Sequence, residues 1–200
     1  QEINDICHDQ IIQNKAIPAP LNYKGFPKSV CTSVNHVVCH GIPSERKILS
    51  DGDIVNVDVT VILNGWHGDS SRMFVAGKTN KKNYEFLKIT YESLLIGISE
   101  AKPGKHIGDI GNKIQKLAEG KGYSVVRDFC GHGIGKKFHT PPSVLHFGEP
   151  GEGPMLEPGM FLTIEPMINL GGWQTKILND GWTAVTVSYT HLRAHETVHY

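Results

Sequence analysis

The segment that decides the fold is residues 54–66, Ile-Val-Asn-Val-Asp-Val-Thr-Val-Ile-Leu-Asn-Gly-Trp. Valines fill every second position, so they share one face of a strand, while the polar side chains share the other face. The pair Asn64–Gly65 is the strongest short signal for a two-residue hairpin turn. A turn at that place pairs Thr60 with Asp69. Asp58 then becomes the diagonal neighbour of Asp69 on one face, with Cβ atoms ~7 Å apart or less.

Two carboxylates that point the same way repel each other unless a positive charge lies between them. One interpretation places Asp58 and Asp69 on a solvated sheet face, where water screens the repulsion. The valines on both sides of Asp58 favour a buried strand instead. We therefore predict that a metal ion lies between the two carboxylates.

An internal repeat links this hairpin to a second carboxylate about half the chain away. Residues 48–58 align with residues 155–165, and both segments carry a leucine, a glycine, an apolar pair and a final carboxylate at the same spacing. Chance can produce a match of this length. The alternative is two related halves, each of which directs a carboxylate from a strand towards a shared centre. The repeat pairs Asp58 with Glu165.

A histidine in a glycine-rich loop completes a candidate set of metal donors. His132 lies within Gly131–Gly135, and the flanking glycines let the backbone approach a ligand closely. Alone, such a histidine is more often a hydrogen-bonded polar residue in a turn. Together with Asp58, Asp69 and Glu165 it suits manganese, iron(II), cobalt or zinc. Bridging carboxylates can hold two such ions about 3.5–4 Å apart.

Helices and antiparallel hairpins together place the chain in the α+β class. Apolar residues at three- and four-residue steps predict three helices, and an ordered loop over residues 16–28 follows the first. The predicted core-facing residues are Ile3, Ile6, Cys7 and Ile11 in the first helix, Tyr84, Leu87, Tyr91, Leu94 and Ile98 in the second, and Ile107, Ile110, Ile114 and Leu117 in the third.

The composition argues against several classes of protein. There are 20 basic and 20 acidic residues, whereas a nucleic-acid-binding protein needs a basic excess or patch. No apolar run is long enough for a membrane span, and no charged-then-apolar leader marks secretion. The four cysteines form no CxxC pair and no dense framework. This usage indicates reduced thiols and predicts a cytoplasmic protein.

Four motifs stand in a recognisable order along the chain. They are residues 35–43 (NHVVCHGIP), the hairpin with its two aspartates, Gly131–Gly135 followed by Phe138–His139, and residues 163–167 (TIEPM). Together they closely resemble the type I methionine aminopeptidases of bacteria. The resemblance covers residues 1–186 and implies a single domain with the pita-bread fold, in which two pseudo-symmetric αβ halves enclose a dinuclear metal centre.

The resemblance also implies roles for individual residues. The first four metal ligands of the family correspond to Asp58, Asp69, His132 and Glu165. Glu165 would act as the proton shuttle, His139 would steady the oxyanion, and His40 would contact the peptide beyond the cut. The positions that line the methionine pocket correspond to Tyr23, Phe26, Cys31, Phe138 and Trp182, for which ordinary core packing is the alternative.

The chain departs from the family pattern after residue 186. The family carries a second glutamate as its fifth ligand, whereas residues 187–200 read VSYTHLRAHETVHY. Glu196, followed by Thr197, is the predicted fifth ligand. We interpret residues 187–200 as an anomalous tail, an artefact of sequencing, and residues 1–186 as a fragment of the domain. We expect the strand beside Glu165 to be broken and the chain as written to be a poor enzyme.

The activity that the resemblance implies is removal of the N-terminal methionine from nascent polypeptides when the second residue is small. Two divalent ions, of cobalt, manganese, iron(II) or zinc, would lower the pKa of a bridging water from 15.7 to around 7 and so supply hydroxide. The substrate would be a deformylated terminus with a free amine. The enzyme would meet it as a monomer in the cytoplasm, near the ribosome and without contact to nucleic acid or membrane.

Three alternatives compete with this interpretation. A peptidase of the proline-dipeptide class shares the fold but usually carries a large additional N-terminal domain. A metal-free homologue that binds a protein or ribosomal partner would have lost the ligand residues, four of which stand here. A thiol enzyme built on Cys39 and His40 is disfavoured, because adjacent residues on an extended strand point to opposite faces. Metal content separates the first two classes.

Overall fold

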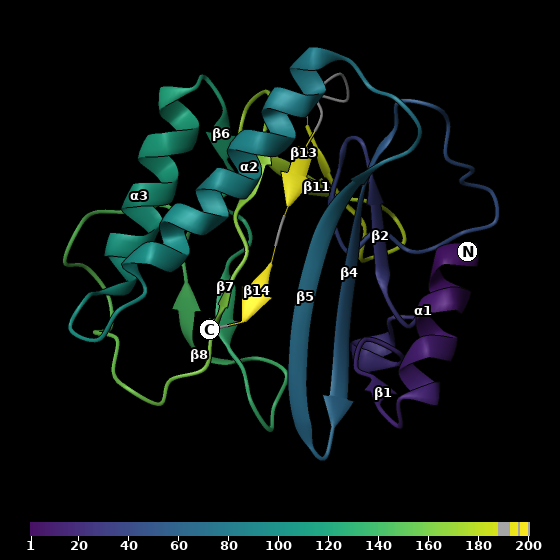
Figure 1. The fold of residues 1–200 in the computed structure, drawn as a ribbon, viewed down its shortest axis with the longest axis horizontal. Coiled ribbons are helices and arrows are strands. Elements are labelled where there is room, and N and C mark those ends of the chain that lie inside the picture. Colours follow the sequence, from purple (N-terminus) through teal and green to yellow (C-terminus); the bar gives the residue numbers. More distant parts are fainter. Residues whose placement is uncertain (188–192, 196, 200) are drawn as a thin grey trace.

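The structure is a computed structural model that describes residues 1–187, 193–195 and 197–199. Its elements follow one another along the chain as drawn in Figure 1. They are α1 (Glu2–Gln13), β1 (Ile17–Pro18), the 3₁₀ turn η1 (Tyr23–Gly25), β2 (Cys31–Val34), β3 (Val37–Cys39), β4 (Ile54–Leu63), β5 (Trp66–Val75), α2 (Lys81–Glu100), α3 (Ile107–Gly120), β6 (Ser124–Val125), β7 (Gly131–Gly133), β8 (Thr140–Val144), β9 (Thr163–Ile164), β10 (Met167–Asn169), β11 (Thr175–Ile177), β12 (Ala184–Thr186), β13 (Arg193–His195) and β14 (Val198–His199).

The long hairpin of β4 and β5 has the predicted register. Leu63 pairs with Trp66 and Thr60 pairs with Asp69. Asn64 and Gly65 have φ angles of 51° and 80°, and a tight turn of this type needs a positive φ at both central residues. On its other edge β4 pairs with β2 and β1. The prediction of the hairpin is confirmed.

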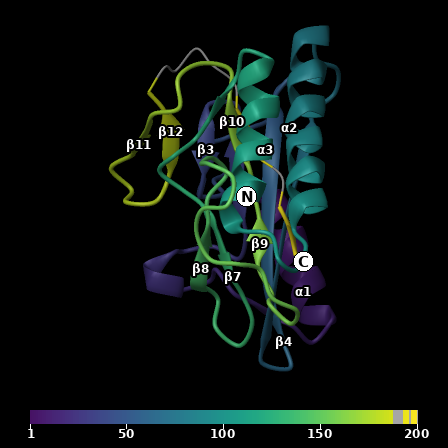
Figure 2. The same cartoon turned by 90° about the vertical axis from the view of Figure 1, so that its left-hand side faces the viewer.

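Helices cover the sheets from two sides. Figure 1 shows α2 and α3 side by side at one flank and α1 at the opposite flank, and Figure 2 shows β11 and β12 on the side away from α2. The valine face of β4 packs towards α1, because Val59 and Val61 contact a buried cluster that includes Ile11 and Val30. The larger core lies beneath α2 and α3, and its fully buried side chains include Ile54, Phe86, Leu94, Ile110, Ile114, Val125, Ile164 and Ile168.

Two predicted helix faces are partly wrong. On α2, Tyr84 and Tyr91 are 49% and 39% exposed, and the inward stripe is instead Asn83, Phe86, Ile89, Thr90, Ser93, Leu94 and Gly97. On α1, Ile6 is 58% exposed, whereas Asn4 is buried. Asn4 takes the inward position because its Oδ1 accepts a hydrogen bond of 2.9 Å from the backbone N–H of Ser29.

The inward stripe of α2 includes small and polar residues beside its large apolar ones, and α3 packs very close to it at Gly97. A Cβ on Gly97 would lie 2.7 Å from Cδ1 of Ile114, so a larger residue at this place would require the Ile114 side chain to move. The hydroxyls of Thr90 and Ser93 donate to the carbonyls of Phe86 and Ile89 one turn earlier, at 3.0 and 2.8 Å. Their burial therefore leaves no hydroxyl proton without an acceptor. A search for large apolar residues misses such a face.

The internal repeat has a structural counterpart. Gly52 and Gly159 hold the same place in the two segments and have φ angles of 91° and 92°. Each glycine lies in a turn closed by one backbone bond, from Asp53 N to the Ser50 oxygen at 3.0 Å and from Met160 N to the Glu157 oxygen at 3.3 Å. The same turn thus precedes each strand that carries a carboxylate. This is the pseudo-symmetry that the repeat predicts.

The backbone near Glu165 is paired, contrary to the broken strand expected from the sequence. β13 runs antiparallel to β10, which starts two residues after Glu165, and β14 runs antiparallel to β9. Thr197 also forms a bridge to Ser71 on β5. The described part of residues 187–200 therefore adds strands to the centre of the molecule. In the part of the chain that the structure covers, no helix is both long and apolar enough to cross a membrane.

Candidate metal centre

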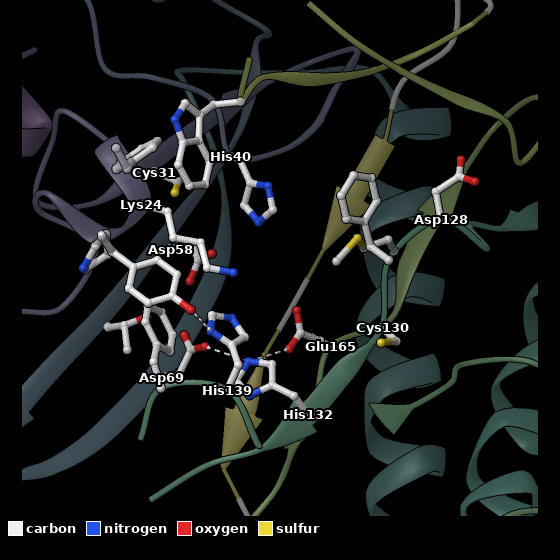
Figure 3. Close-up of a pocket in the computed structure, with 18 residues that line it drawn as sticks. Lys24, Cys31, His40, Asp58, Asp69, Asp128, Cys130, His132, His139 and Glu165 are labelled. Carbon is white, nitrogen blue, oxygen red and sulfur yellow. Dashed lines mark hydrogen bonds and ion pairs between the residues drawn. The ribbon is translucent and has the colours of Figure 1, made fainter. Parts of the chain in front are cut away.

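A cavity of about 360 Å³ lies between the β4–β5 hairpin, the loop around η1 and the segments that carry His132 and Glu165. The predicted site residues in the described part of the chain all line it: Tyr23, Phe26, Cys31, His40, Asp58, Asp69, His132, Phe138, His139, Glu165 and Trp182. Figure 3 shows Asp69, His132 and Glu165 gathered at one end and His40 and Cys31 towards the other. Glu196 lies outside the described residues.

Three donors from three separate segments converge at the polar end of this cavity. Asp69 comes from β5, His132 from β7 and Glu165 from the end of β9, and one donor atom of each lies within 4.8 Å of the others. The Nε2 of His132 is 3.8 Å from Oδ2 of Asp69 and 3.7 Å from Oε1 of Glu165. Donors bonded to one ion at about 2.1 Å stand roughly 3–4 Å apart. The donor set therefore fits a divalent ion.

Asp58 faces the same cavity from the neighbouring strand. It pairs with Ser71, two residues along β5 from Asp69, so the two carboxylates are diagonal neighbours, as the sequence predicts. Across the other edge of β4, Asp58 pairs with Cys31. Burial raises the pKa of the Cys31 thiol well above its ordinary value, and the charge of Asp58 raises it further. The thiol is therefore neutral beside the carboxylate.

The glycines on both sides of His132 are needed because neighbouring backbone leaves no room for a side chain. A Cβ on Gly131 would collide with the backbone oxygen of Thr163, and a Cβ on Gly133 would collide with the backbone oxygen of Pro141. The residues on both sides of His132 must therefore be glycine for β7 to lie this close to its neighbours. This closeness brings the imidazole to Glu165.

A hydrogen bond fixes which nitrogen of His132 faces the cavity. Its Nδ1 is 3.0 Å from the backbone oxygen of Gly133. A carbonyl oxygen can only accept, so Nδ1 carries the proton. The Nε2 then presents a lone pair towards Asp69 and Glu165. This is the tautomer that ligates a metal, with the other ring nitrogen held by a backbone acceptor.

His139 stands in a row of stacked rings next to the donors. Its ring centroid is 4.2 Å from those of His132 and Phe138, and Phe138 stacks in turn on His67 at 5.5 Å. Burial lowers the pKa of His139 to about 4, and the ammonium group of Lys24 nearby adds to this effect. The imidazole is therefore neutral at pH 7. Its Nδ1 lies 3.0 Å from the hydroxyl of Tyr23.

The other end of the cavity is aromatic. Phe26 and Trp182 meet edge to face at 5.2 Å, and His40 lies edge-on to Trp182 at 6.1 Å. Cys39, by contrast, belongs to a buried core cluster with Val38. His40 faces the cavity while Cys39 does not line it, which argues against a thiol enzyme built on this pair.

Some residues of the site were not found from the sequence. His146 is fully buried, and its Nε2 accepts a hydrogen bond of 3.0 Å from the backbone N–H of Glu165. It stands alone between Leu145 and Phe147 in an apolar segment, so no spacing signal marks it. Lys24 and Asp128 also line the cavity. Thr163 could have been found, because it precedes Glu165 by two residues and shares a strand face with it.

Comparisons with known proteins agree with this geometry. The model of the metallopeptidase family M24 matches residues 1–197. The methionine aminopeptidase of Rickettsia prowazekii (strain Madrid E) is 56% identical over 185 residues, which cover 92% of this chain and 71% of that protein. The enzyme of the same name from Escherichia coli (strain K12) is 50% identical over 92% of this chain and 70% of its own length.

Solved structures give the same result. The crystal structure of the Rickettsia prowazekii methionine aminopeptidase has a TM-score of 0.97 at 53% identity, over 99% of this chain and 79% of that chain. The Thermotoga maritima enzyme has a TM-score of 0.96 at 36% identity, with the same coverage of both chains. The prolidase of Pyrococcus furiosus shares the fold, with a TM-score of 0.63 at 24% identity over 83% of this chain and 44% of that chain. The chain therefore belongs to metallopeptidase family M24, among the bacterial methionine aminopeptidases.

Proposed function

We propose that this chain removes the N-terminal methionine from polypeptides with Asp58, Asp69, His132 and Glu165 as its metal ligands. The observation that carries the proposal is the single cavity in which a carboxylate–imidazole donor set faces an aromatic wall. Hard oxygen donors with one imidazole suit cobalt, manganese, iron(II) or zinc. Such an ion, when bound, polarises a carbonyl and lowers the pKa of a bound water.

The residues around the donors supply the proton transfers. Glu165 lies at the edge of the donor set, where its carboxylate accepts a proton from water and returns it to the leaving amine. His139 is neutral at pH 7, so only one of its nitrogens carries a proton. In our proposal the Tyr23 hydroxyl, 3.0 Å from Nδ1, donates to this nitrogen, which would leave the ring proton on Nε2 for the developing oxyanion.

The aromatic end of the cavity selects methionine. A thioether sulfur makes favourable contacts with the edges of aromatic rings, and Phe26, Trp182 and Tyr23 offer such edges. The neutral Cys31 thiol adds a soft atom to this wall. His40 contacts the peptide backbone beyond the cut, and a bulky second residue would collide there. We therefore propose small second residues and free-amine termini as substrates.

We also propose Glu196 as a fifth ligand, whose carboxylate would help to hold a second ion. Its neighbour Thr197 pairs with Ser71, and the Ser71 hydroxyl donates to the Thr197 hydroxyl at 3.0 Å. The strand before Glu196, β13, pairs with β10, and the strand after it, β14, pairs with β9; these two partners lie just after and just before Glu165. Glu196→Gln should lower the affinity for a second cobalt(II) ion more than for the first, as measured by calorimetry.

The setting of the reaction is part of the proposal. The substrates are nascent N-termini, so we place the enzyme in the cytoplasm near the ribosome, acting as a monomer. The four cysteines form no disulfide, which supports a reducing compartment; they are Cys7, Cys31, Cys39 and Cys130. Sedimentation of the purified protein alone tests the monomeric state, and sedimentation with ribosomes tests the association with the ribosome.

Peptide hydrolysis tests the function. With added cobalt(II) or manganese, Met-Ala-Ser should be cleaved, whereas formyl-Met-Ala-Ser and Met-Lys-Ser should resist. Asp69→Asn should abolish turnover, and the matched change Asp9→Asn on the exposed surface of α1 should leave it intact. Equal turnover of Met-Ala-Ser and Met-Lys-Ser, or cleavage by metal-free protein, would contradict the proposal.

A further inference from the structure

Thr163 joins two of the proposed ligands through a single buried hydroxyl. Its side chain has no exposed surface and does not line the cavity. The Oγ1 accepts a hydrogen bond of 2.9 Å from the backbone N–H of His132 and donates one of 2.6 Å to Oε1 of Glu165. The carbonyl of His132 is 3.5 Å away, so the single hydroxyl proton goes to the carboxylate. A bond this short is typical of a hydroxyl donating to a carboxylate.

This arrangement follows from the local backbone. Residues two apart on a strand point to the same side, so Thr163 and Glu165 share a face. Gly131 lets β7 come close enough for the N–H of His132 to reach the hydroxyl. The hydroxyl thereby connects the strand that carries the imidazole to the strand that carries the carboxylate.

The same position is polar in the other half of the molecule. In the internal repeat Asn56 corresponds to Thr163, and it too stands two residues before a ligand carboxylate. Asn56 is buried, and its Nδ2 donates at 3.2 Å to the hydroxyl of Ser71 on the adjacent strand. Each half therefore carries a buried polar side chain that links the carboxylate strand to its neighbour.

We infer that Thr163 is a positioning residue of the metal centre, which fixes the rotation of the Glu165 carboxylate relative to His132. The inference rests on the proposed function. The hydroxyl bonds to Oε1, which is the same carboxylate oxygen that lies 3.7 Å from Nε2 of His132, so a rotation of the carboxylate would break this bond. Figure 3 shows the side chains of His132 and Glu165 facing each other. Partners of this kind are worth about 10–100-fold in metal affinity.

Three variants test the inference with cobalt(II) as the probe. Thr163→Val keeps the branched shape but lacks the hydroxyl, and Thr163→Ser keeps the hydroxyl. Thr90→Val is the matched control, because Thr90 is equally buried and its hydroxyl donates within α2, away from the cavity. Binding is measured by calorimetry and by the visible absorption of bound cobalt, after circular dichroism has shown that each variant is folded.

We expect Thr163→Val to weaken cobalt(II) binding about 10–100-fold and to change the absorption spectrum. Thr163→Ser should restore both to parental values, and Thr90→Val should bind like the parent. With Met-Ala-Ser at saturating cobalt, Thr163→Val should lower kcat and leave KM close to the parental value, since Thr163 does not touch the cavity.

Parental affinity and spectrum in Thr163→Val would overturn the inference, even if its melting temperature falls. If Thr163→Val does not fold, the comparison of Thr163→Ala with Thr163→Ser decides in the same way. Asp69→Asn separates this result from the proposed function. Parental cobalt binding by Asp69→Asn would overturn the metal site itself, whereas loss in Asp69→Asn with no loss in Thr163→Val would overturn only the role of Thr163.

Discussion

The imidazole of His146 is buried completely and serves as an acceptor for the backbone of a ligand residue. Burial lowers the pKa of His146 to about 3, so the folded protein keeps the ring neutral. The unfolded chain takes up a proton near pH 6.5, the ordinary value. Between about pH 6.5 and pH 3 the unfolded state therefore binds more protons, and stability must fall as the pH falls.

At the residue scale, we predict that His146→Gln flattens this dependence. Each such histidine contributes a slope of up to about 1.4 kcal/mol per pH unit in the free energy of unfolding. The variant should be less stable than the parent at pH 7, yet lose less stability between pH 6.5 and pH 4. Urea unfolding of the metal-free proteins at several pH values measures both. Parallel curves for parent and variant would contradict the prediction.

At the scale of elements, the approach of β7 to β9 depends on Gly131. We predict that Gly131→Ala destabilises the protein by about 1–3 kcal/mol, a magnitude typical of overpacking in a close-packed interior, because its Cβ would meet the oxygen of Thr163. Cobalt(II) binding should weaken with it. Gly120→Ala at the end of α3 is the control, since a Cβ there meets nothing within 4 Å. It should be neutral or stabilising. Chemical denaturation of both variants checks the contrast.

The start of α3 offers a second element to test. The carboxylate of Asp109 accepts from the backbone N–H of His106 at 2.7 Å and from that of Gly151 at 3.1 Å. These bonds, the one from His106 first, lower the pKa of Asp109, so their contribution is present near neutral pH and is lost as the pH falls below the ordinary range of a carboxyl. Asp109→Ala should cost about 1 kcal/mol at pH 7 and less at pH 3. An equal loss of stability at pH 7 and at pH 3 would argue against this role of the Asp109 carboxylate at the start of α3.

For the whole molecule, the donors come from both pseudo-symmetric halves, so the unfolded chain has no preformed site. We predict that cobalt(II) at about 100 times its dissociation constant adds about 2.7 kcal/mol to the free energy of unfolding. Chelation should remove this gain, and Asp69→Asn should not show it. Thermal melts with cobalt(II) or chelator give the answer. A melting temperature that changes neither with cobalt(II) nor with chelator would contradict a metal site formed by residues of both halves.

Patterns that depend on neighbours in the sequence could be predicted well. Alternation and an Asn-Gly turn define the β4–β5 register, and so the diagonal placement of Asp58 and Asp69. The repeated turn at Gly52 and Gly159 likewise indicates two related halves.

Features that depend on close contact between distant segments could not be predicted. The inward face of α2 is set by how near Ile114 comes to Gly97, which no periodicity of α2 reveals. His146 acts through one bond to a distant backbone N–H. The pairing of β13 with β10 was missed because residues 187–200 do not resemble the family in sequence, while the backbone of Arg193–His195 still pairs with β10.

The order of the ligands along the chain has a consequence for synthesis. The hairpin with Asp58 and Asp69 leaves the ribosome first, and for the time that translation needs to reach His132 and Glu165 it carries two facing carboxylates with no imidazole opposite them. A newly made copy can therefore bring Asp69, His132 and Glu165 together only after residue 165 has been synthesised, so the donor set that would capture an ion cannot form on the hairpin alone.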